Sequence, residues 1–308
     1  MPSAGEIRDQ VAQETERRNR LAVPAFAGGF VYLISAIVIA STINSAPTVG
    51  LLQGLAPAIS GVATPAVSPR TPWVTFVSHH SLALIAGGAL AALALVVLTL
   101  ILLLLDGATR FRRPKTWAAT RPLLLAGGVG LALASIGHQV VSAIETHSFV
   151  AGHDHSNHAV ERALLTGTAN TLVDYLGLLG GLALVVGMIA AMVNAIRVGL
   201  IARWLGMVGM LAAVLIVLPG TSAELQVIPA FWIVMIGVLF LGRWHNGDPP
   251  AWAAGEARPW PPRAGMSTAG ARPAAAGAGP EGAVTPAPVQ PASGGSSRKR
   301  RRKRGGGR

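Results

Sequence analysis

The segment "SLALIAGGALAALALVVLTLILLLL" (81–105) contains no charged side chain. A helix needs about 20 consecutive apolar residues to cross the hydrocarbon core of a membrane. In a soluble domain, apolar and polar residues alternate at helical or strand spacing, because one side of each element faces water. No such alternation interrupts this segment, so it predicts a membrane-spanning helix.

Other apolar segments lie on both sides of this one. They cover residues 21–43, 121–144, 170–193, 204–220 and 227–242. The last two are short for a span, and the turn "TSAELQ" between them predicts a helical hairpin. Charged residues make up 12% of the 308-residue chain, about half the usual share in soluble domains. We predict an all-α fold, a polytopic transmembrane helix bundle of about six spans within residues 21–243.

The distribution of Lys and Arg predicts the orientation of these spans. Basic residues lie before the first span, between the second and third, and after the fourth and sixth. The opposite loops, 45–78 and 146–169, contain only Arg70 and Arg162. Positive residues stay on the cytoplasmic side during insertion. We therefore predict a multi-pass protein of the cell membrane with both termini in the cytoplasm.

Residues 1–20 form the predicted cytoplasmic N-terminal segment. "SAGE" (3–6) has the pattern of a helix capping box, with Ser3 as N-cap and Glu6 three residues later. Glu14 with Arg18 and Glu16 with Arg20 have the spacing of ion pairs on one helix face. The segment shows no apolar stripe, so we expect a solvated helix that leads into the first span.

Residues 244–308 are rich in Pro, Ala, Gly and Ser, which predicts a disordered cytoplasmic tail. We expect the tryptophans near its start, Trp244, Trp252 and Trp260, at the level of the lipid headgroups. The tail ends in a basic run that predicts binding to anionic headgroups of the bilayer. No aromatic residue interleaves this run, so we do not expect nucleic acid as a partner. The basic run comprises Arg298, Lys299, Arg300, Arg301, Arg302, Lys303 and Arg304.

The stretch "GHDHSNH" (152–158) is the most histidine-rich part of the predicted outer loop 146–169. Neutral imidazole suits zinc, copper or nickel, so a divalent metal site is one interpretation. The spacings His-x-His and His-x-x-His do not match a recognised zinc motif. A solvated polar loop without a cofactor is the other interpretation. The candidate metal ligands are His147, His153, His155 and His158.

Two ionisable residues, His138 and Asp174, lie in the outer halves of the third and fourth predicted spans. Ionisable groups inside a membrane are costly and are therefore functional candidates. Small residues at helical spacing on both spans favour close packing, which would bring this pair together in a buried position. A structural hydrogen bond is the alternative interpretation. The supporting polar residues are Ser142, Glu145 and Asn170.

The motifs do not favour an enzyme. The sequence has no cysteine, no Gly-x-Ser-x-Gly, no His-Glu-x-x-His and no phosphate-binding glycine loop. We predict a non-enzymatic scaffold or accessory subunit with an outward-facing His/carboxylate pocket and a possible membrane-protein partner. A permease for a small solute or metal ion, and an extracytoplasmic sensor of metal or pH, remain alternatives. A permease would need polar groups in the inner halves of the spans, where we find no titratable residue.

The last two predicted spans and the segment that follows them resemble known membrane proteins. "RVGLIARWLGMVGMLAAVLIVLPG" (197–220), "FWIVMIGVLFLGRW" (231–244) and "GDPPAWAAGEARPWP" (247–261) resemble multi-span membrane proteins of high-GC actinobacteria. The resemblance implies a helical membrane domain and no particular activity.

Overall fold

The computed structural model describes residues 3–48, 50, 59, 61, 67–218, 224–244, 247–258 and 260, apart from the side chains of Leu165 and Thr166. These residues belong to one compact unit, Met1–Pro261. Residues 49–63, an apolar run of the predicted loop 45–78 whose entry into the membrane the sequence leaves open, lie mostly outside the described residues. The basic run 298–304 lies wholly outside them.

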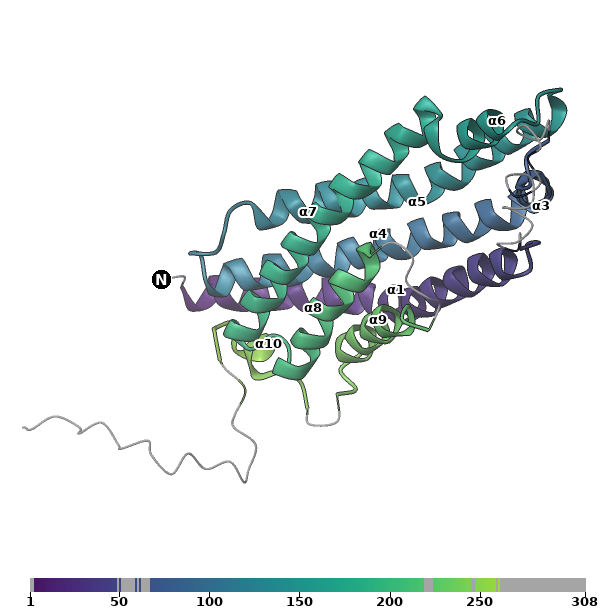
Figure 1. The fold of residues 1–308 in the computed structure, drawn as a ribbon. Coiled ribbons are helices and arrows are strands. Elements are labelled where there is room, and N and C mark those ends of the chain that lie inside the picture. Colours follow the sequence, from purple (N-terminus) through teal and green to yellow (C-terminus); the bar gives the residue numbers. More distant parts are fainter. Residues whose placement is uncertain are drawn as a thin grey trace, which may run out of the picture. The chain divides into compact units, whose positions relative to one another are not determined.

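The described residues contain helices and no strand, which confirms the predicted all-α fold (Figure 1). The long helices are α1 (Ala4–Asn44), α4 (Ser81–Arg112), α5 (Thr120–Ala151) and α7 (Thr168–Val198). The shorter ones are α3 (Thr71–His79), α6 (Asn157–Glu161), the π-helix η1 (Arg162–Thr166), α8 (Arg203–Val217), α9 (Val227–Phe240) and α10 (Pro250–Ala254).

Four helical segments are long and apolar enough to cross a membrane: Ala4–Asn44, Ser81–Arg112, Thr120–Ala151 and Asn157–Val198. The apolar helices α8 and α9 have only 15 and 14 residues. At 1.5 Å per residue they are about 21–23 Å long, short of the roughly 30 Å of a hydrocarbon core. Helix length thus supports four spans and does not by itself support six.

Helix α1 joins two segments that we expected to be separate. The predicted N-terminal helix and the first span form one continuous helix, which contains Pro24. Its capping box forms as predicted: the Glu6 N–H donates to Ser3 Oγ at 3.3 Å, and the Ser3 N–H donates to Glu6 Oε2 at 2.6 Å. The capping box fixes the start of α1, which then continues without interruption to Asn44.

Six helices contact one another in the order α1, α4, α5, α7, α8 and α9, and α9 contacts α1 again. Figure 1 shows the four long helices running beside one another. We call the end at which α1 begins and α4 and α7 terminate the basal end, and the opposite end the distal end. Because α8 starts near the basal end of α7 and is short, the hairpin of α8 and α9 covers mainly the basal half.

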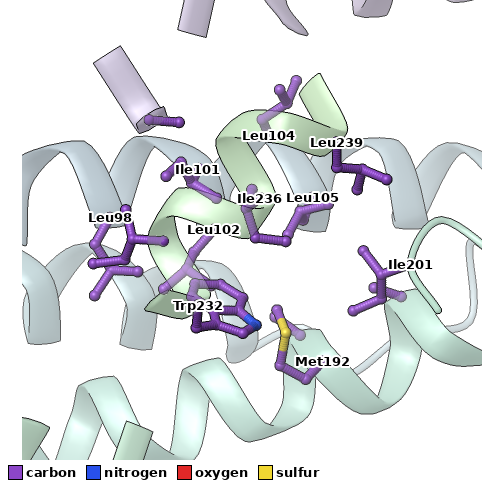
Figure 2. Close-up of a cluster of buried hydrophobic side chains, with 14 of the residues drawn as sticks. Leu98, Ile101, Leu102, Leu104, Leu105, Met192, Ile201, Trp232, Ile236 and Leu239 are labelled. Carbon is purple, nitrogen blue, oxygen red and sulfur yellow. The ribbon is translucent and has the colours of Figure 1, made fainter. Parts of the chain in front are cut away.

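The largest apolar core of the described residues contains buried side chains from α1, α4, α5, α7, α8 and α9, part of which Figure 2 shows. Leu98 and Leu102 of α4 are fully buried, as are Met192 of α7 and Trp232 of α9. The Trp232 indole N–H donates to the Leu205 carbonyl at 2.9 Å, which satisfies its polar atom within the core. This core holds α9 against α4 and α8.

The beginning of the predicted tail is folded. Residues Pro250–Ala254 form α10, and Trp244 and Trp252 are each only 5% exposed. The Trp252 indole N–H donates to the Leu200 carbonyl at 3.0 Å. These two tryptophans therefore pack within the helical unit, and their position at the level of the lipid headgroups stays a prediction. Residues 262–308 lie outside the described residues.

Candidate functional site

Helices α5 and α7 approach each other through small residues, as the sequence predicted. A methyl group at Gly127 would overlap the backbone of Leu184, and one at Gly180 would lie 2.9 Å from the Leu131 nitrogen. Ala126, one of the small residues that recur at helical spacing on the third predicted span, is exposed. The two backbones are therefore close enough to bring facing polar side chains within a few ångströms.

His138 and Asp174 face each other across the distal part of this contact. His138 Nδ1 lies 3.6 Å from Asp174 Oδ1, slightly beyond a direct hydrogen bond. The side chains are 53% and 61% exposed. The sequence therefore predicted their proximity, but our expectation that they are buried is wrong.

The length of α8 explains why this pair is exposed. A methyl group at Gly181 of α7 would lie 2.6 Å from Val217, which is the last residue of α8. Asp174 precedes Gly181 by seven residues, or roughly two helical turns, and so lies on the same face of α7. Because α8 ends at Val217, it covers this face at Gly181 and not at Asp174.

The supporting polar residues have different surroundings. Asn170 is 3% exposed, and its Nδ2 donates to the Ala163 carbonyl at 3.4 Å. Glu145 and Asn170 both border Gly167, because a Cβ built there would lie 3.3 Å from Glu145 Oε1 and 3.4 Å from Asn170 Nδ2. The Ser142 carbonyl accepts a 2.7 Å hydrogen bond from the Thr146 hydroxyl. Asn170 thus has a hydrogen-bond partner in the protein, whereas the side chains of His138 and Asp174 remain exposed.

The stretch "GHDHSNH" forms a turn that begins α6. The Ser156 N–H donates to Asp154 Oδ1 at 2.9 Å, and Ser156 Oγ caps α6 by accepting from the Ala159 N–H. Hydrogen bonds from the Ser156 backbone and side chain hold the pKa of the Asp154 carboxyl below its ordinary range. The polar residues of this stretch therefore have a local structural role.

The predicted metal ligands do not converge. His147 Nδ1 lies 2.8 Å from the Ala143 carbonyl, and the His155 ring packs edge-on against Phe149 at 5.0 Å. His153 and His158 are exposed. Within the described residues, no three His, Asp or Glu side chains are grouped so that they could hold a metal ion.

A cluster of charged residues at the basal end, buried except for Asp248, was not predicted. Glu14 of α1 pairs with Arg112 of α4 through contacts of 2.8 and 3.0 Å, and Arg18 pairs with Asp248 at 2.8 Å. Both guanidinium groups lie 5.6 Å from the ring centre of Trp252. We call Glu14, Arg18, Arg112, Asp248 and Trp252 the basal cluster.

The sequence contained a partial signal for this cluster. Glu14 and Arg18 have the spacing of a local ion pair, but each pairs instead with a residue far along the chain. Asp106 is also buried near this end and pairs with Arg110 at 2.7 Å. Asp106 lies one residue beyond the predicted span 81–105, so the basal part of α4 contains a buried carboxyl group that pairs with its neighbour.

Comparison of the chain with protein families, with curated proteins and with solved structures gives no match. The class of protein is therefore indicated by the helices themselves. Four helices long and apolar enough to span a bilayer indicate an α-helical membrane protein.

Proposed function

We propose that the chain is a non-enzymatic scaffold or accessory subunit of the cell membrane, whose open His138–Asp174 face contacts a membrane-protein partner. The observation that carries this proposal is the exposure of both side chains, 53% and 61%, within helices otherwise suited to a bilayer. Ionisable groups at such positions normally face protein or water and not lipid. An exposed ionisable face of this kind fits a protein that covers the face by binding another membrane protein.

The packing of the basal half supports this proposal over a permease. Leu98, Leu102, Met192 and Trp232 fill the space between the helices there and are fully buried. The charged residues of the basal cluster are paired with one another. A solute path would need polar groups at several depths, whereas apolar side chains fill the core of the basal half.

The arrangement of the helix ends supports an orientation with both termini in the cytoplasm and six spans. Arg18, Arg112, Arg197 and Arg203 all belong to the basal end of their helices. The positive-inside tendency then assigns the basal end to the cytoplasm. The short helices α8 and α9 would form the fifth and sixth spans as a hairpin in a locally thinner or tilted arrangement.

The basic run Arg298–Arg304 supports a second contact, with anionic lipid. Each Lys or Arg near an anionic surface contributes about 1 kcal/mol of attraction. If the termini are cytoplasmic, this run is on the side of the membrane where anionic lipids are found. Bilayer lipid and one membrane-protein partner are thus the proposed interactions.

Reporter fusions test the proposed orientation. A reporter that is active only in the cytoplasm should score positive when inserted within 110–116 or fused after Arg308, and negative when inserted within 150–160. A cytoplasmic signal at 150–160 would overturn the orientation and, with it, the outward position of His138 and Asp174.

A further inference from the structure

The hairpin of α8 and α9 leaves the distal half of the helix ring without a cover. The residues at its distal end are exposed, with exposed fractions of 49% for Leu218, 43% for Leu225 and 48% for Val227. Helices α1, α4, α5 and α7 continue past this point (Figure 1). Beyond Val217, the last residue of α8, an uncovered surface carries His138, Asp174 and Leu178. We call this surface the distal face.

The Asp174 carboxylate is the one fixed charge among the three side chains that define the distal face. Between Arg121 and Arg197 the sequence contains four carboxyl side chains, Glu145, Asp154, Glu161 and Asp174, and Arg162 as its single Arg or Lys. Glu145 and Asp174 belong to α5 and α7, whereas Arg162 lies in the short η1 segment. A complementary occupant would therefore bring a cation to Asp174.

The position of the distal face favours an elongated apolar occupant. The face lies in line with α8, beyond Val217, on the same side of α7 that α8 covers at Gly181. Leu178, on the α7 turn between Asp174 and Gly181, is 53% exposed. A helix that continued the path of α8 would cover this leucine and approach Asp174.

A second copy of this chain does not supply the required group. Among the residues of α1, α4, α5 and α7, every Lys and Arg lies toward the basal end of its helix. The four long helices of a copy inserted in the same orientation would thus present no Lys or Arg at the depth of Asp174. We therefore place the cation on a different chain.

We propose that the distal face binds a single apolar transmembrane helix of another protein, which carries one Lys or Arg in its outer half opposite Asp174. The proposal rests on the accessory function proposed above and names the chemistry of the partner. The basic side chain pairs with the Asp174 carboxylate, and His138 Nδ1, at 3.6 Å from Asp174, lies beside this contact. The apolar part of the helix covers Leu178 and the end of α8.

Designed peptides test this proposal with the full chain in phosphatidylcholine vesicles. The chain has no cysteine, so Ser148→Cys gives one labelling position at the distal end of α5. Three labelled transmembrane peptides differ only at one outer-half position, which is Lys, Leu or Glu. We expect energy transfer to show about tenfold tighter association of the Lys peptide than of the Leu peptide, in line with polar contacts between membrane helices.

Three carboxyl variants provide the comparison. Asp174→Asn should reduce the affinity for the Lys peptide to that for the Leu peptide, whereas Asp154→Asn, in the exposed loop, should leave it unchanged. Asp174→Glu should retain the preference for Lys. Because the Asp174 side chain is 61% exposed, its replacement should not unfold the protein, which a thermal melt checks.

Three results would overturn the proposal. They are equal binding of the Lys and Leu peptides, preference for the Glu peptide, or Asp174-dependent energy transfer between copies of this chain. None of these results concerns the orientation of the chain, which the reporter fusions test separately. A failure of the partner chemistry is thus distinguishable from a failure of the proposed membrane arrangement.

Discussion

Glu14 and Arg112 form a buried ion pair between positions that are 98 residues apart. Their side chains are only 4% and 0% exposed, and two nitrogen–oxygen contacts of 2.8 and 3.0 Å join them. Arg112 also donates to the carbonyls of Ala108 and Ala251. One guanidinium group thus ties α1, α4 and α10 together at the basal end.

Removal of Glu14 should therefore be strongly destabilising. Glu14→Ala leaves the Arg112 guanidinium buried without a carboxylate, and we expect a loss of about 3–5 kcal/mol in the free energy of unfolding. Denaturant unfolding in detergent measures it. The control is Glu16→Ala, because the Glu16–Arg20 pair is 63% and 78% exposed and should contribute less than about 1 kcal/mol. Equal effects of both changes would contradict the structural role of the buried pair.

The Trp252 indole should stabilise the unit through both its ring and its N–H group. Trp252→Phe keeps an aromatic ring beside the two guanidinium groups but loses the hydrogen bond to Leu200, at a cost of about 1 kcal/mol. Trp252→Ala removes the buried ring as well and should cost about 3–5 kcal/mol. Thermal unfolding compares them with Trp117→Ala, whose side chain is largely exposed. If Trp252→Ala matched that control, the packing of α10 would be refuted.

Glycine substitutions distinguish close helix contact from helix propensity. Gly127→Ala introduces a methyl group that overlaps the Leu184 backbone, and we expect a loss of about 1–3 kcal/mol. A Cβ at Gly107 of α4 would have no neighbouring atom within 4 Å, so Gly107→Ala should stabilise the helix by about 0.5–1 kcal/mol. Unfolding midpoints of the two variants should shift in opposite directions. A shift in the same direction would argue against the α5–α7 contact.

The exposure of His138 and Asp174 lowers the expected cost of removing either one. His138→Ala and Asp174→Ala should each change the free energy of unfolding by less than about 1 kcal/mol, because both side chains are exposed. Asn170→Ala provides a comparison, since Asn170 is buried and hydrogen-bonded, and should cost about 1–3 kcal/mol. A double-mutant cycle for His138 and Asp174 measures their coupling. A coupling of several kcal/mol would show that the pair is buried.

The basic run should bind anionic membranes electrostatically. A peptide of residues 292–308 should bind vesicles that contain phosphatidylserine, bind neutral vesicles weakly, and dissociate as salt is raised. Vesicle sedimentation measures this binding. A peptide in which the seven basic residues 298–304 are replaced by Gln is the control. Equal binding to both kinds of vesicle would refute the lipid contact, and a preference for RNA at physiological salt would favour nucleic acid instead.

The sequence alone determined which helices are long enough to cross a membrane, and it determined the start of the N-terminal helix at Ser3. Apolar length is a local property, and a hydrocarbon core admits only segments whose backbone groups are satisfied internally. The capping box of Ser3 and Glu6 likewise depends on residues within one turn. Close packing of α5 on α7 could be predicted because consecutive spans are antiparallel neighbours and small residues recur on both.

The tertiary structure decided which partners the polar residues have. Glu14 could pair with Arg18 along one helix face, but burial selects Arg112, which is available only after α1 packs on α4. Trp252 lies in a segment whose composition suggests disorder, and it is ordered by contacts with α1, α4 and Leu200. The exposure of Asp174 depends on where α8 ends relative to Gly181. These relationships join residues distant in sequence, so no local pattern contains them.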